Sequence, residues 1–157
     1  MAPDTPDIPC TRAAAARAAL TAATLAQGRD LHLLSLCLLL PALAALLLAP
    51  GGPARSACLT LSLVAGTVQV YHALRCGLDA ALFAHWATCW SRPTASDADV
   101  DADLQAFDHA LAEDFGRAPL TPRPLAERVR GALGLLRRQA LALGIQGLTL
   151  LAAMAAG

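Results

Sequence analysis

Two pairs of metal-type ligands share one spacing in this chain. His72 precedes Cys76 by four residues, and His85 precedes Cys89 by four. On an α-helix this spacing places both members of a pair on one face, so the two pairs could supply a Cys₂His₂ metal site. On one straight helix the pairs would point roughly 100–140° apart, and a shared site would need a break near Gly77. We therefore treat these four residues as weak metal candidates, with packed thiols and histidines as the simpler interpretation.

A run of alternating acids follows, formed by Asp97, Asp99, Asp101 and Asp103. It begins like a calcium loop, but Ala102 stands where that loop needs glycine and Asp108 stands where it needs glutamate. Ser96 with Asp99 forms a capping box instead, and acids favour the first turn of a helix because of the helix dipole. The sequence holds no catalytic motif that we can identify. We predict a protein without catalytic residues or a cofactor, not an enzyme.

The elements that position these residues are dominated by three uncharged stretches, residues 31–49, 56–74 and 139–157. As helices, each is long enough to cross a hydrocarbon core of ~30 Å. The sequence predicts an all-α integral membrane protein with three transmembrane helices. A short Pro-Gly loop joins the first two as an antiparallel hairpin, and the third stands at the C-terminus. Whether the third stretch spans the membrane completely stays open.

The arginines predict how these helices are oriented. Of the twelve basic residues, all of them arginine, only Arg55 lies between the first two stretches. The other eleven precede the first stretch or lie in residues 75–138, which predicts that the N-terminus and this segment are cytoplasmic. Asp4 and Asp7 count against an organellar transit peptide. We expect a multi-pass protein of a bacterial inner membrane.

Residues outside the three stretches predict further helices. Residues 1–30 form a cytoplasmic N-terminal segment with an Ala-rich helix. Residues 75–90 extend the second transmembrane helix, 97–115 form an acidic helix and 124–138 a basic one, and the last two fold back as a cytoplasmic hairpin. The apolar faces of this hairpin carry Leu104, Phe107, Leu111, Phe115, Val129 and Leu133. These faces either cover each other or dock on a partner or a second copy.

Polar and small residues form one stripe on each of two transmembrane helices. The stripes carry Ser62, Gly66 and Gln69 on the second helix and Gln139, Gln146 and Thr149 on the third. Small residues allow close helix approach in lipid, and buried amides there seek partners. We expect these residues to make helix–helix contacts. Gln69 and Gln146 meet each other, or both meet a partner helix, or each bonds to its own backbone.

Three functions remain compatible with these observations. The first is an accessory or scaffolding subunit of a membrane protein complex, whose partners are membrane lipids and other subunits or copies of itself. The second is a small homo-oligomeric pore or membrane-disrupting effector, which requires the polar stripes to face water. The third is a metal handler built on the His/Cys pairs. The formal net charge of zero gives no reason to expect a nucleic-acid partner.

Overall fold

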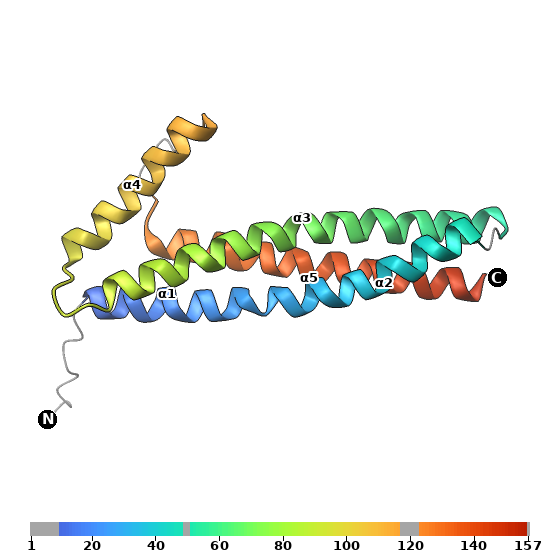
Figure 1. Ribbon diagram of the computed structural model, residues 1–157, viewed down its shortest axis with the longest axis horizontal. Helices are drawn as coiled ribbons and strands as arrows, with labels where there is room; N and C mark the ends of the chain where they lie inside the picture. Colours follow the sequence, from blue (N-terminus) through green and yellow to red (C-terminus); the bar gives the residue numbers. More distant parts are fainter. Residues whose placement is uncertain (1–9, 49–50, 117–122, 157) are drawn as a thin grey trace, which may run out of the picture. The chain divides into compact units, whose positions relative to one another are not determined.

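The computed structural model describes residues 10–48, 51–116 and 123–156, and over these ranges it consists of helices joined by short turns, with no strand (Figure 1). Five helices follow one another along the chain: α1 (Cys10–Ala26), α2 (Gly28–Leu48), α3 (Pro53–Trp90), α4 (Asp97–Phe115) and α5 (Leu125–Ala155). The expected all-α class is therefore correct. The N-terminal nine residues, parts of the two predicted turns and Gly157 lie outside the described residues.

The helices are longer than the uncharged stretches suggested. α2 begins at Gly28, ahead of the first stretch, and α3 covers the second stretch and runs on to Trp90 as predicted. α5 joins the basic segment and the third stretch in one helix. Nothing in these junctions stops a helix, because charged residues such as Arg137 are good helix formers.

Among the described residues, two stretches are long and apolar enough to cross a membrane, Cys10–Leu48 and Pro53–Trp90. α5 is not among them. Its C-terminal part is rich in alanine and glycine and contains Gln139 and Gln146, which makes it less apolar than the leucine-rich α2. The prediction of three spans is thus supported for two helices by length and composition, and the third is taken up below as a proposal.

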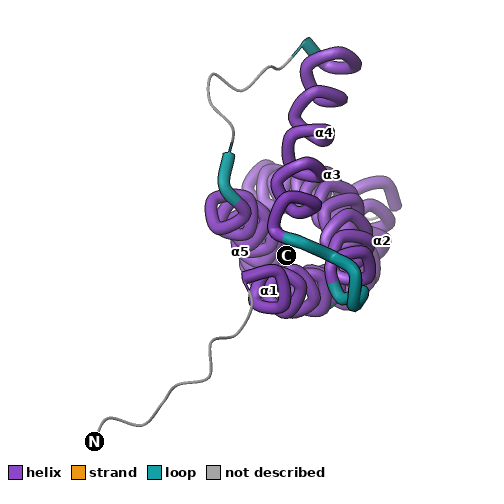
Figure 2. Tube along the Cα trace, turned by 90° about the vertical axis from the view of Figure 1, so that its left-hand side faces the viewer, coloured by secondary structure: helices purple, strands orange, loops and turns teal. Residues whose placement is uncertain are grey.

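The chain divides into two compact units. Unit 1 contains residues 1–23 and 80–131, and unit 2 contains residues 24–79 and 132–157. In unit 2, α2 and the N-terminal part of α3 run antiparallel, and α5 lies beside both (Figures 1 and 2). Unit 1 contains most of α1, the end of α3, the whole of α4 and the start of α5. Each unit has its own interior.

The interior of unit 2 follows a seven-residue repeat. Its buried positions include Gly28, Ser35 and Ala42 on α2, Ser62, Gln69 and Cys76 on α3, and Ala132, Gln139, Gln146 and Ala153 on α5. A repeat of seven keeps one seam of each helix against its neighbours, as in coiled coils. Here the seam holds small and amide side chains instead of leucine, so the helices pack closely.

The outside of unit 2 is apolar. Large side chains that stand exposed include Leu40, Leu47 and Leu48 on α2, Val64, Val68 and Leu74 on α3, and Leu141, Leu148, Leu151 and Met154 on α5. Near the chain's end, Ala42, Leu59 and Ala153 form a small buried cluster. Most large apolar side chains of unit 2 therefore face outward while several amides and hydroxyls lie inside, although Leu25 and Leu59 are buried. This pattern is largely the reverse of a water-soluble bundle.

Candidate functional site

Three helices meet at Gln146 in the middle of unit 2. The Ser35 hydroxyl donates to Gln146 Oε1 at 2.6 Å, and Gln146 Nε2 donates back to the Ser35 carbonyl at 3.0 Å. From α3, the Ser62 hydroxyl donates to the Gln146 carbonyl at 3.1 Å. All three side chains are fully buried. Gln146 thus links α5 to α2 through its side-chain amide and to α3 through its backbone carbonyl, which fixes the register of three helices.

Gly66 permits this close approach. A Cβ atom at this position would stand 2.9 Å from Gln146 Nε2 and would clash with the Leu39 side chain of α2. Only a residue without a side chain allows α3 to lie this near both neighbours. The expectation that Gly66 belongs to a helix–helix contact agrees with this placement.

A second amide layer lies seven residues away. Gln139 Nε2 donates to the Gly28 carbonyl at 2.6 Å. A Cβ atom on Gly28 would stand 2.8 Å from Gln139 Oε1 and 3.6 Å from Cys76 Cβ. α2, α3 and α5 therefore meet again at this level, which we call the Gly28 layer, after Gly28, Cys76 and Gln139.

Gln69 occupies the stretch of α3 between the two layers. Its side chain is fully buried, and neither amide atom has a hydrogen-bond partner among the described residues. Gln69 and Gln146 do not hydrogen-bond to each other in this structure, where the Gln146 amide is bonded to Ser35. Thr149 hydrogen-bonds within its own helix, to the carbonyls of Ile145 and Gln146. Of the three amides in the two predicted stripes, Gln139 and Gln146 are hydrogen-bonded to α2, and Gln69 has no partner among the described residues.

In unit 1, α4 is held by three of its aspartates, each bonded to a different helix. The Thr11 hydroxyl of α1 donates to Asp97, and Trp90 Nε1 of α3 donates to Asp103 at 2.8 Å. Arg128 of α5 forms an ion pair with Asp108, with 2.6 Å between Nη2 and Oδ2. The acidic run predicted from the sequence therefore fastens α4 to its surroundings as well as capping it.

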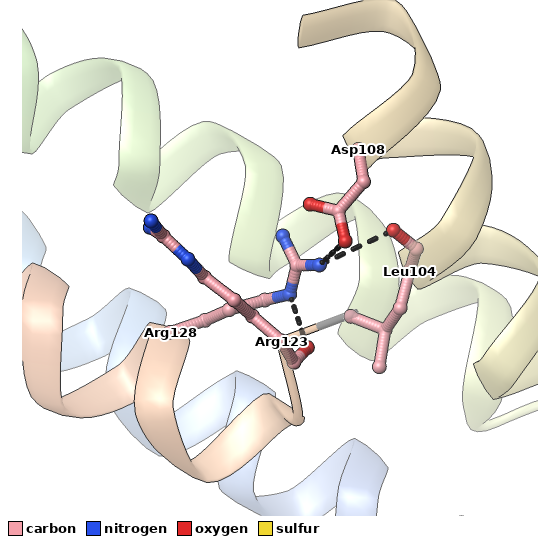
Figure 3. A network of polar contacts seen from close by, with 4 residues as sticks. All are labelled: Leu104, Asp108, Arg123 and Arg128. Atoms are coloured by element: carbon pink, nitrogen blue, oxygen red, sulfur yellow. Dashed lines mark hydrogen bonds and ion pairs between the residues drawn. The ribbon is translucent and has the colours of Figure 1, made fainter. Parts of the chain in front are cut away.

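The Arg128 guanidinium makes two further hydrogen bonds (Figure 3). Nη2 also donates to the Leu104 carbonyl of α4 at 3.3 Å, and Nε donates to the Arg123 carbonyl at 3.0 Å. The group lies 5.4 Å from the Phe107 ring centroid, within range of a cation–π contact. Arg128 is largely buried, so this pair is shielded from solvent more than a surface salt bridge is.

Aromatic rings cover much of the face predicted for docking. Trp86 stacks on Trp90 and meets the edge of Phe107, with centroid distances of 5.5 and 5.6 Å. Leu104 is buried beside them, and Phe107 is partly buried.

The remaining predicted docking residues are less enclosed. Leu111 and Val129 are partly buried, Leu133 is exposed, and the Phe115 side chain lies outside what the structure describes. Part of the α4 face is thus covered within the chain itself, by Trp86 of α3 and Arg128 of α5.

The predicted capping box is present at the start of α4. Ser96 accepts from the Asp99 backbone, and the Asp99 carboxylate accepts from the Ser96 backbone N–H and hydroxyl, each at 2.8 Å. The Ser96 backbone hydrogen bond, followed by that of its hydroxyl, lowers the pKa of Asp99 below its ordinary value. Asp97, Asp99 and Asp103 of the alternating run are thus accounted for as cap and tertiary contacts, while Asp101 is exposed.

The His/Cys pairs do not come together as a metal centre in the described residues, where no group of three or more His, Cys, Asp and Glu side chains is placed to hold an ion. His85 Nε2 and Cys89 Sγ lie 3.7 Å apart. Cys76 is buried in the Gly28 layer, and His72 Nδ1 is buried without a described partner. Since α3 is continuous through Gly77, the break that a shared site would need does not occur.

Several residues of these sites were not singled out from the sequence. Ser35 and Gly28 stand seven residues apart in or beside a leucine-rich stretch, and this spacing of small residues was the available signal. Arg128 resembles its neighbouring arginines, so nothing in the sequence distinguishes it. Comparison with known proteins gives no match, whether with family models, curated proteins or solved structures.

Proposed function

We propose that this chain is an accessory or scaffolding subunit of a membrane protein complex, embedded through α2, α3 and α5. The observation that carries the proposal is the exposure pattern of unit 2. Five polar side chains are fully buried, Ser35, Ser62, Gln69, Gln139 and Gln146, while leucines such as Leu40, Leu47 and Leu148 stand exposed. In water such a surface would aggregate, whereas in lipid it is the favourable one.

α5 is proposed as the third transmembrane helix. From Gln139 to Ala155 it carries no charge. Gln146 is hydrogen-bonded to α2 through both amide atoms and Gln139 through Nε2, while Gln139 Oε1 has no partner among the described residues. Satisfied amides cost far less in lipid than free ones. The distribution of arginine supports a cytoplasmic N-terminus, a cytoplasmic unit 1 and a bacterial inner membrane as the location.

A scaffolding role agrees with the chemistry of the two units better than the alternatives do. A pore lined by the polar stripes needs Ser62, Gln69 and Gln146 to face water, yet all three are fully buried within one chain. A metal handler needs ligands that converge, and the His/Cys pairs do not. What unit 2 offers a partner is an apolar surface in the membrane, and what unit 1 offers is the exposed, acidic side of α4.

The first test is membrane embedding and orientation. Carbonate extraction of cell membranes should leave the chain in the pellet. A C-terminal alkaline phosphatase fusion should be active, and a phosphatase inserted in the α4–α5 loop should be inactive. A chain released by carbonate would overturn embedding, and an inactive C-terminal fusion would overturn a spanning α5.

The second test is partnership. The tagged chain is purified in mild detergent, and its native mass and companions are determined by mass spectrometry. A stoichiometric larger partner supports the subunit role. A ring of identical copies with channel conductance, abolished by Gln146→Leu, would replace it with the pore, and a monomer without companions would contradict both.

A further inference from the structure

We propose that four arginines around the Gly28 layer bind the phosphate groups of anionic phospholipids at the cytoplasmic face. The inference rests on the membrane embedding proposed above. The residues are Arg29 on α2, Arg75 on α3, and Arg137 and Arg138 on α5, and all four are exposed. We call them the arginine collar.

The Gly28 layer places the collar at one level. Gly28, Cys76 and Gln139 meet there, and each is the direct sequence neighbour of a collar arginine. Three helices far apart in sequence therefore present guanidinium groups at the same height of unit 2. No single helix contains this arrangement, so the packing of the amide layer creates it.

The collar also marks the end of the apolar surface. From Arg29 to the end of α2, and from Arg138 to the end of α5, the helices rise ~25–30 Å, close to the thickness of a hydrocarbon core. Most exposed large apolar residues of unit 2 fall within this band, with Leu78 and Leu133 just beyond it. Tyr71 stands exposed one turn inside the band, as suits an interfacial aromatic residue.

The chemistry of the collar fits a phosphodiester. Guanidinium groups bind phosphate oxygens through paired hydrogen bonds, and basic residues beside an anionic leaflet are attracted to it. Two acids, Asp30 and Asp79, lie at the same level and reduce the local charge, so the collar carries a formal +2. This modest charge favours a few bound lipids over general adhesion to any anionic surface.

The test measures lipid binding by the full chain in neutral detergent micelles. Phosphatidylglycerol is added to purified protein, and thermal stability and lipid retention in native mass spectrometry are recorded, with phosphatidylcholine as the reference lipid. We expect phosphatidylglycerol to raise Tm and to be retained. The Arg29→Gln/Arg75→Gln/Arg138→Gln variant should bind it more weakly, by about fivefold per arginine removed.

Matched variants separate the site from charge alone. Arg12→Gln/Arg17→Gln/Arg130→Gln removes the same charge from exposed positions of unit 1 and should leave lipid retention unchanged. The triple variant Arg29→Lys/Arg75→Lys/Arg138→Lys keeps the charges and should retain most of the lipid binding. That result would exclude misfolding as the cause of the loss in the triple Gln variant. Equal losses in the two Gln variants, or an equal Tm rise with inorganic phosphate alone, would overturn the proposal. Carbonate extraction of the same variants tests embedding separately.

Discussion

The two units of this chain hold their helices together through different kinds of contact. In unit 2 the contacts are amides, hydroxyls and glycines, as in the bonds between Ser35 and Gln146. In unit 1 they are aromatic rings and charged groups, as in the pair of Arg128 with Asp108. No charged side chain is among the buried residues described for unit 2, whereas an enclosed ion pair joins two helices of unit 1.

The difference follows from the solvent that each unit is proposed to meet. A carboxylate inside lipid costs several kcal/mol, about 2.5–3.5 by insertion scales, whereas a paired amide is tolerated. In unit 1, which is proposed to lie in the cytoplasm, an ion pair can be partly hydrated and still orient a helix. We therefore expect the stabilities of the two units to respond differently to the same kinds of substitution.

The chain provides a separate reporter for each unit. Both of its tryptophans, Trp86 and Trp90, lie in unit 1, so fluorescence follows that unit. Cys76 is buried in unit 2, and its thiol becomes reactive only when that unit opens. The thiol measurement uses a background in which Cys10, Cys37, Cys58 and Cys89 are replaced by serine.

The largest effect is expected from Arg128→Met. The change removes the ion pair and two backbone contacts while it keeps the aliphatic bulk, and it leaves Asp108 largely buried without a charge partner. We expect a loss of about 2–3 kcal/mol of unfolding free energy, seen as a lower denaturant midpoint of tryptophan fluorescence. Cys76 protection should be unchanged.

Two matched variants sharpen this result. Arg130→Met alters an exposed arginine on the same helix and should shift the midpoint little. Arg128→Met/Asp108→Leu removes both charges and should recover part of the loss. If Arg128→Met and Arg130→Met behave alike, the pair contributes nothing to unit 1.

The next effect concerns Gln146→Leu in unit 2. The substitution removes both bonds to Ser35 and leaves that serine's buried hydroxyl without its partner. We expect a loss of about 1–2 kcal/mol, measured as faster labelling of Cys76 in mild detergent. Tryptophan fluorescence should be unaffected. A change in fluorescence with unchanged labelling would reverse the assignment of Gln146 to unit 2.

Sequence patterns predicted the elements better than their partners. The capping box, the end of α3 at Trp90 and the polar stripes follow from local chemistry, which neighbouring residues determine. The partner of Gln146 does not, because Ser35 is one hydroxyl in a leucine-rich helix and only packing selects it. Arg128 likewise stands among similar arginines, and the position of α4 decides which one is enclosed.

A smaller effect is expected at the start of α4. Ser96→Ala removes the N-cap and should cost about 1 kcal/mol, detected as faster backbone hydrogen exchange in the first turn of α4. Ser96→Asp, which keeps a capping oxygen, should restore much of the protection.

The same cap gives a pH dependence. Hydrogen bonds from Ser96 lower the pKa of Asp99, so their contribution to stability is present above the carboxyl group's ordinary pKa. It is lost as pH falls through the lowered one. Asp99→Asn removes the titrating carboxylate and should therefore flatten the acid limb of an α4 exchange profile, whereas Ser96→Ala keeps the backbone hydrogen bond and should reduce the limb only in part. An unchanged limb would mean that other acids control it.

The smallest effect, and the one that tests the comparison most closely, is expected from Gln69→Leu. Gln69 is as buried as Gln146, but its amide makes no hydrogen bond among the described residues. Replacing an unpaired buried amide with an apolar side chain of similar length removes a desolvation cost and no contact. Cys76 labelling should thus stay the same or slow, the opposite of Gln146→Leu. Labelling that accelerates as much as in Gln146→Leu would mean that Gln69 is bonded in the membrane, to lipid, water or a partner helix. Unit 2 would then be held by its surroundings as well as by its own amide layers.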